Sequence, residues 1–267
     1  MYTFIRRIIV LGTPLALAIL NLFHPSPQAI RPNLDWWITL HILNLPLFAL
    51  LGLAAILLLE GQRGLVATCS RVLLAIFAVV YPAFDAMVGI GSGIMIRFAT
   101  TLPASQQVPI FLATREFFRF GSIASLIAIV GSAAWLLGIL AAAVALARPV
   151  WSRWLVISLA GAVFLLWLLV QAEFALSLAT LISIGTTSGV LVLICVALAV
   201  VARPHPAVGL LAASGFFFAI DHAAPFGPLG MILFLLAAAQ LEFLRQRQAA
   251  GVPTVAGAPS LAGESTP

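Results

Sequence analysis

The sequence predicts an all-α integral membrane protein, a bundle of about eight transmembrane helices joined by short loops. Of its 267 residues, 63% are hydrophobic and only 8% are charged, whereas a soluble domain carries about 25% charged residues. A globular protein with so few charges would have to expose mostly apolar side chains to water. The apolar residues also form runs close to the ~20 residues that cross a ~30 Å hydrocarbon core. These observations exclude a soluble enzyme.

Each predicted span is bounded by charged, aromatic or loop-forming residues. The first span follows Arg6 and Arg7, and Ala16-Leu17-Ala18 resembles a signal-peptide cleavage site. Because the apolar run continues to Phe23, we expect an uncleaved helix. The second span begins at the aromatic pair Trp36-Trp37, which is typical of a membrane interface. The eight predicted spans cover about residues 8–23, 36–59, 67–92, 121–147, 154–172, 180–202, 206–221 and 227–244.

Three segments differ in length or composition from the predicted full-length spans. The longest connection is 97–120, and its second half, Pro109 to Phe120, mixes aromatic and charged residues. This pattern predicts a short helix lying in the membrane interface. Spans 206–221 and 227–244 are short, so a re-entrant hairpin is the alternative to two full crossings. The end, 248–267, is rich in Ala, Gly, Pro, Ser and Thr and is predicted to be a disordered cytoplasmic tail behind the transmembrane domain 1–247.

Arginine placement predicts the orientation. All 13 basic residues are arginine, and positive charge is enriched on the cytoplasmic side of membrane proteins. With a cytoplasmic N-terminus and eight spans, the inner arginines are Arg6, Arg7, Arg63, Arg71, Arg148, Arg153, Arg203, Arg245 and Arg247. The outer ones are Arg31, Arg97, Arg115 and Arg119. We therefore expect a multi-pass protein of the bacterial inner (plasma) membrane with both termini cytoplasmic.

The net charge of +5 reflects these arginine anchors. The chain has no basic run and no interleaved aromatic platform of the kind that binds nucleic acid. The lipid bilayer is therefore the expected partner, and nucleic acid is not. The two cysteines, Cys69 and Cys195, share no motif, so the sequence indicates neither a zinc knuckle nor a disulfide framework.

The pair His41 and Asp85 is the centre of the functional hypothesis. Asp85 lies well inside the third predicted span, where a carboxylate costs a few kcal/mol unless it is paired, protonated or facing water. His41 lies about one turn beyond Trp37, at a similar predicted depth below the outer surface. The pair either forms a functional polar site or makes a structural hydrogen bond that fastens two helices.

Other polar residues are predicted to gather at the same outer end. Asn21 and His24 end the first span, and His41 and Asn44 begin the second. Each pair has i, i+3 spacing, which places its two side chains on one helical face. Asp221, His222 and Glu173 end later spans on that side. The predicted site therefore comprises His41, Asp85, His24, His222 and Asp221, supported by Asn21, Asn44 and Glu173; His205, on the inner side, is excluded.

Neutral imidazoles with carboxylates form a ligand set for zinc, iron or copper. The sequence therefore predicts His24, His41 and His222 as metal ligands, for a transition metal or a haem. The residue types resemble those around zinc in membrane hydrolases of the alkaline-ceramidase type, which combine three histidines, an aspartate and a serine. This chain lacks the paired His-x-x-x-His that such enzymes carry on a late helix. The resemblance therefore covers residue chemistry alone and transfers no residue roles.

Glycines near the predicted site are interpreted as packing positions. Gly89-Ile-Gly91-Ser-Gly93 follows Asp85 but lacks the helix N-terminus of a phosphate-binding unit, so we expect it to permit close helix approach. Gly131 and Gly138 lie seven residues apart on one face of the fourth predicted span and receive the same interpretation.

Three functional classes remain open from the sequence. The first is a metal- or haem-binding membrane protein, with or without enzymatic activity on a lipid or quinone-like substrate, so that a small apolar or lipid-like ligand is a possible partner. The second is a transporter or permease in which Asp85 and His41 relay protons or meet substrate. The third is a structural or assembly factor whose polar cluster only fastens helices.

Overall fold

The computed structural model describes residues 2–26, 29–119, 121–147 and 206–250, and in these ranges every regular element is helical. The α-helices in chain order are α1 (Tyr2–Arg7), α2 (Thr13–Leu22), α3 (Leu34–Leu58), α4 (Leu65–Asp85), α5 (Ser92–Thr100), α6 (Ala104–Arg115), α7 (Ile123–Leu146), α10 (Pro206–Ile220) and α11 (Phe226–Ala249). π-Helical turns at Ile8–Gly12 and Ala86–Gly91 join α1 to α2 and α4 to α5. One-turn 3₁₀ segments at Arg31–Asn33 and Glu116–Phe118 precede α3 and follow α6.

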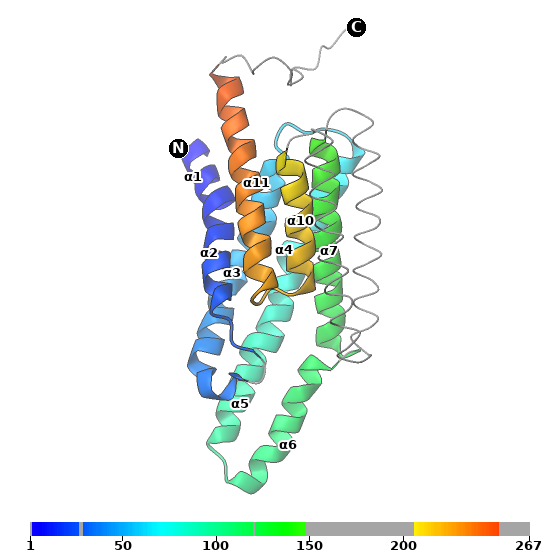
Figure 1. The fold of residues 1–267 in the computed structure, drawn as a ribbon. Coiled ribbons are helices and arrows are strands. Elements are labelled where there is room, and N and C mark those ends of the chain that lie inside the picture. The colour runs from blue at the N-terminus through cyan, green and yellow to red at the C-terminus, as the bar shows by residue number, and fades with distance from the viewer. Residues whose placement is uncertain (1, 27–28, 120, 148–205, 251–267) are drawn as a thin grey trace.

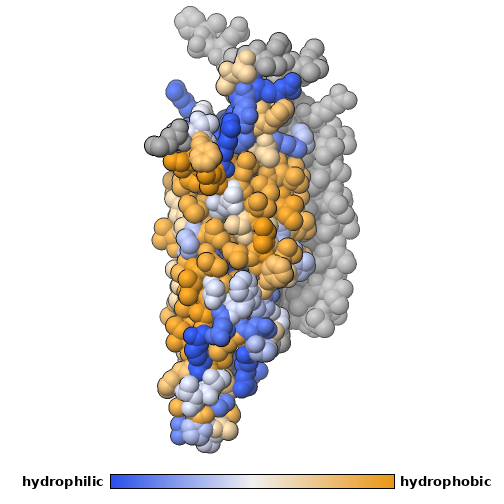
Figure 2. Space-filling view, turned by 90° about the vertical axis from the view of Figure 1, so that its left-hand side faces the viewer, coloured by the Kyte–Doolittle hydropathy of each residue, from blue (hydrophilic) through white to orange (hydrophobic). Residues whose placement is uncertain are grey.

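The membrane character predicted from composition is consistent with this architecture. Five helical stretches of the described chain are long and apolar enough to cross a membrane: Tyr2–Leu22, Arg31–Leu58, Leu65–Thr100, Ala104–Leu146 and Phe226–Ala249. The short α10 is apolar but has only 15 residues. Figure 2 shows, on one face, an apolar band between hydrophilic residues at the upper end and a second hydrophilic zone below.

Some predicted spans coincide with described helices. α3 and α7 begin and end within two residues of the predicted spans 36–59 and 121–147. The predicted spans 154–172 and 180–202 lie outside the described residues, as does most of the predicted tail, so the described helices do not confirm the count of eight. α10 and α11 form an antiparallel hairpin (Figure 1), with α11 extending to Ala249.

The segment after the third predicted span differs from expectation. The helix that begins at Leu65 continues through α5 to Thr100, a stretch of 36 residues and therefore about 54 Å long. α6 begins at Ala104, earlier than the predicted interfacial helix at Pro109, and returns beside α5. Figure 1 shows α5 and α6 as a hairpin that extends past the lower end of the other helices. The prediction of 97–120 as a connection between spans, helical only in its second half, is therefore wrong for α5 and the start of α6.

Small residues and aromatic rings bring the helices together. A Cβ added at Gly131 would lie 3.0 Å from Tyr81 Cδ2, and one at Gly138 would lie 3.0 Å from Leu74. α7 therefore packs closely on α4, as the glycine spacing predicted. The aromatic core continues from this contact, with the ring centroids of Phe77 and Trp135 4.8 Å apart. This core supports one side of the site.

An ionic cluster lies at the upper end of the bundle, where α1 and the end of α11 meet (Figure 1). The buried Arg6 guanidinium donates to the buried Glu242 carboxylate, and its Nε lies 2.9 Å from Glu60 Oε2. Arg245 donates to the Leu58 carbonyl at 2.6 Å. These contacts hold the first and last described helices against the end of α3.

Candidate metal centre

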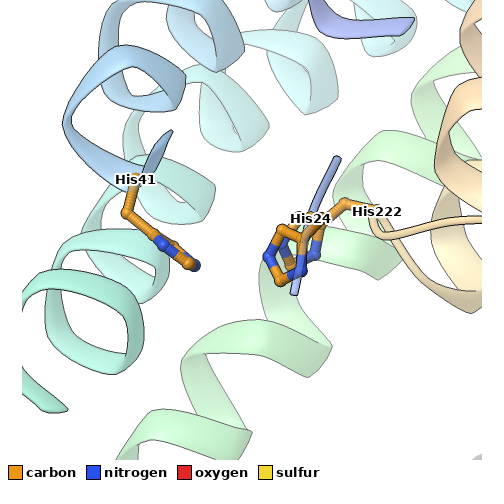
Figure 3. A group of neighbouring side chains, drawn as sticks. All are labelled: His24, His41 and His222. Atoms are coloured by element: carbon orange, nitrogen blue, oxygen red, sulfur yellow. The ribbon is translucent and has the colours of Figure 1, made fainter. Parts of the chain in front are cut away.

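Three histidines from separate parts of the chain meet near one point. His24 follows the end of α2, His41 lies two turns into α3, and His222 lies in the connection between α10 and α11. One ring nitrogen from each lies within 4.8 Å of the others. Figure 3 shows His41 pointing from α3 toward His24 and His222. The His24 ring is central, with its centroid 5.1 Å from that of His41 and 4.9 Å from that of His222.

Backbone carbonyls fix the orientation of two of these rings. His24 Nδ1–H donates to the Pro25 carbonyl at 2.8 Å, and His41 Nδ1–H donates to the Trp37 carbonyl at 2.7 Å. Because a carbonyl can only accept, Nδ1 must carry the proton in both rings. The Nε2 lone pair is then free in the neutral imidazole. This is the arrangement found around metals, where a ligating histidine donates its other N–H to a carbonyl or carboxylate.

The third ring is held by a tyrosine and by a tight turn. His222 Nδ1 lies 3.1 Å from Tyr81 Oη. In the same turn Asp221 Oδ1 accepts the Ala223 N–H at 2.9 Å. A Cβ at Gly227 would lie 1.8 Å from the His222 carbonyl oxygen, so only glycine allows the chain to close this turn. The turn positions His222 over the cluster.

Asp85 is a buried carboxylate at the edge of the histidine cluster. Its side chain is 1% exposed, and Oδ1 lies 3.8 Å from Nε2 of both His41 and His222. Among the described residues, neither oxygen of Asp85 accepts a hydrogen bond. Asp85 is the last residue of α4, directly before the π-helical turn, and π-turns occur frequently at functional sites.

The distances from Asp85 to the His41 and His222 rings are closer to those between two ligands of one metal ion than to those of hydrogen bonds. Hydrogen bonds join atoms 2.7–3.2 Å apart, so 3.8 Å is too long for one. Two ligands bound 2.0–2.1 Å from a tetrahedral zinc lie about 3.3 Å from each other. Around a shared ion the Asp85–His41 and Asp85–His222 distances would shorten by about 0.5 Å. The ring nitrogens of the three histidines, which lie within 4.8 Å of one another, would approach by up to about 1.5 Å. Two histidine Nε2 atoms, those of His24 and His222, are also buried without a hydrogen bond.

Burial also favours the ligand form of the two histidines outside the membrane-spanning helices. Desolvation lowers the pKa of His24 below its usual value, against the opposing effect of the Pro25 carbonyl. Desolvation lowers the pKa of His222 still further, with contributions from His24 and His41. Both rings are therefore neutral near pH 7, as a metal ligand must be.

The remaining residues of the predicted site lie beside the histidine cluster or outside the described residues. Asn44 Nδ2 donates to Asn21 Oδ1 at 3.2 Å, and both side chains are fully buried between α2 and α3. Asp221 is half exposed, and its Oδ1 lies 3.7 Å from His222 Nδ1, on the side of the ring away from Nε2. Glu173 lies outside the described residues. The structure thus brings His24, His41, His222 and Asp85 together, with Asp221 beside them and the asparagines as a neighbouring pair.

Sequence reasoning did not identify Tyr81 and Trp37 as parts of the site. Tyr81 lies four residues before Asp85, and Trp37 lies four residues before His41. Residues with i, i+4 spacing share a helical face, so this signal was present in the sequence. Trp37 also donates its indole N–H to the Gly89 carbonyl at 2.7 Å, which ties α3 to the π-helical turn after Asp85.

A cavity of about 430 Å³ lies beside His222. Its apolar walls, among the described residues, include Phe84, Val88, Phe117, Phe118, Ile129 and Ile220. Its polar lining is formed by Tyr81, Ser125, Ser132, Asp221 and His222. The cavity and the histidine cluster therefore share one residue, His222.

Comparison of the chain with known protein families, with curated proteins and with solved structures found no match.

Proposed function

We propose that this chain is a multi-pass inner-membrane protein that binds one transition metal ion through His24, His41, His222 and Asp85. The ion that we propose is zinc. The observation that carries the proposal is the buried Asp85 carboxylate, which has no hydrogen-bond donor among the described residues and faces two imidazole Nε2 atoms at 3.8 Å. An isolated buried carboxylate is costly, and a cation between these groups would remove that cost.

The donor set supports a single ion of the zinc class. All four side chains offer nitrogen or oxygen, and the described free cysteine, Cys69, is exposed near the start of α4. Imidazole and carboxylate suit Zn²⁺ and also Fe²⁺, Cu²⁺ or Ni²⁺, with geometry selecting among them. A haem takes its protein ligands on its axial positions, whereas here three imidazoles cluster and a carboxylate lies beside two of them. The arrangement therefore favours a mononuclear ion over a haem.

Metal analysis of the purified protein tests this proposal. The chain would be stripped with a chelator, dialysed against Zn²⁺ and analysed for bound metal. We expect about one ion per chain. Asp85→Asn and His41→Ala should each lower the affinity by at least about 100-fold, because even residues that only support a ligand cost 10–100-fold. Co²⁺ in place of Zn²⁺ would report tetrahedral coordination by its absorption spectrum.

Two matched variants separate ligand loss from general damage. Asp35→Asn removes a carboxylate that is 94% exposed and paired with Arg97, and His205→Ala removes the remaining histidine. Both should bind zinc as the unchanged chain does. A chain that binds no metal after dialysis would overturn the proposal. If Asp85→Asn and His41→Ala lowered yield or melting temperature but kept the metal stoichiometry, the role of the cluster would instead be to hold the helices together.

A further inference from the structure

The cavity beside His222 has the size and the lining of a small-molecule site. Ligand pockets have volumes of roughly 300–1,000 Å³, mostly apolar walls and a few placed polar groups. This cavity measures about 430 Å³, with phenylalanines from α4 and from the turn after α6 on its walls. Its polar groups include Tyr81, Asp221 and His222, which also contact one another. The lining is therefore amphipathic, apolar walls around one polar cluster.

We infer that this cavity binds an uncharged lipid, with its hydrocarbon chain along the phenylalanine walls and its polar group against Tyr81, Asp221 and His222. The bundle has several helices of membrane-spanning length, so bilayer lipid is the apolar solute at highest local concentration. The inference rests on the proposed metal site only in that His222 belongs to both, which places the lipid's polar group next to the metal ligands.

The charge of the lining selects the lipid class. Among the described lining residues there is no arginine, and the only carboxylate is Asp221. An anionic headgroup would meet this carboxylate with no compensating cation from the described lining residues, and burying an unpaired charge is costly. The hydroxyls of Tyr81 and Ser132 can instead hydrogen-bond an ester, amide or hydroxyl group. An uncharged headgroup is therefore the best complement.

Photolabelling in a bilayer tests the inference. The protein would be reconstituted in phosphatidylcholine vesicles with a monoacylglycerol that carries a diazirine near the end of its acyl chain. After irradiation, we expect labelled peptides to contain Phe84, Phe117, Phe118 or Ile129. Ala128 also lines the cavity, and Ala128→Phe should lower this labelling about tenfold, because the added ring occupies the space of the acyl chain. Ala128→Leu is the smaller replacement if the phenylalanine variant does not accumulate.

A control on the same helix and a second probe make the result specific. Ala141→Phe adds the same ring at a partly exposed position about 20 Å further along α7, and it should leave the labelling unchanged. A fatty-acid probe with a free carboxylate should label the cavity less than the monoacylglycerol. Labelling that is spread over the bundle and insensitive to Ala128→Phe would overturn the inference. Stronger labelling by the fatty acid would overturn the assigned headgroup class.

Metal-free protein separates this inference from the proposed function. Because the cavity walls do not include His24, His41 or Asp85, protein stripped with a chelator should still be labelled at the same peptides. Labelling of a chain that binds no zinc would leave the lipid site standing and remove the metal site. Zinc binding without cavity labelling would leave the metal site standing and remove the lipid site.

Discussion

Gly89 shows how a single residue determines whether the histidine cluster can form. A Cβ at this position would lie 1.9 Å from His41 Cδ2 and 2.7 Å from His41 Cβ. The added atom would overlap the near edge of the ring and approach its Cβ, so a larger residue must displace the whole side chain. The glycine also supplies the carbonyl that accepts the Trp37 indole N–H. Gly89 therefore lets α3 lie against the turn after Asp85 with His41 between them.

Gly89→Ala is expected to lower zinc affinity by about 10–100-fold, the range found when the support of a metal ligand is lost. The reason is geometric, because metal–ligand distances tolerate only about 0.2 Å. Overpacking should also lower the free energy of unfolding by about 1–3 kcal/mol. Gly91→Ala is the matched control, since its added Cβ would have no atom nearer than the Ala86 carbonyl oxygen at 3.8 Å. Equal zinc titrations for the two variants would contradict this account.

At the scale of elements, the ends of α1, α3 and α11 are joined by buried charge. Arg6 and Glu242 are 6% exposed in their side chains, and Glu60 lies at the rim with 51% exposure. Removing Glu242 leaves the buried Arg6 guanidinium with the half-exposed Glu60 as its carboxylate partner among the described residues. Loss of a buried partner costs more than the pair contributes. Surface pairs differ, because water and salt screen them.

Glu242→Gln should therefore destabilise the protein by roughly 3 kcal/mol, at the lower limit for breaking a buried pair because the amide can still accept one hydrogen bond. Glu116→Gln breaks a pair in which Glu116 and Arg119 are 60% and 62% exposed, and it should cost less than about 1 kcal/mol. Denaturant titration of both variants in detergent measures the difference. Equal midpoints would show that the ionic cluster does not hold these helices together.

At the scale of the whole molecule, the Arg6–Glu242 contact brings both ends of the described chain to one end of the bundle. The α5–α6 hairpin extends at the opposite end (Figure 1). If the bundle crosses the membrane, the two ends must face different compartments. From the arginine distribution we expect the end with α1 and α11 to face the cytoplasm.

Cysteine labelling tests this orientation. In a variant with Cys69 and Cys195 replaced by serine, Arg119→Cys should react with a membrane-impermeant maleimide in intact cells, because Arg119 is 62% exposed beside the hairpin. Gln248→Cys, exposed near the end of α11, should react only after lysis. Reaction of both positions from the same side would refute the proposed topology.

The sequence alone determined several of the helical segments that the structure describes and why they suit a membrane. Runs of apolar residues near the length of a bilayer core predicted α3 and α7 to within two residues, because local hydrophobicity is sufficient to specify such a span. It also marked Asp85 and His41 as unusual, since an ionisable group inside an apolar run is costly wherever the helix packs. The continuation into α5 was missed because helix length beyond an apolar run depends on packing against a neighbour, here α6.

Only the tertiary structure decided which polar residues meet. His24, His41, Asp85 and His222 are separated by as many as 198 residues, and no local pattern specifies the rotation of one helix against another. That rotation is set by contacts such as Gly89 on His41 and Gly131 on Tyr81, where the absence of a side chain permits close approach. The same packing put Tyr81 on His222 and left Asp85 without a hydrogen-bond donor among the described residues. Close packing of the helices therefore brought scattered polar residues into one cluster.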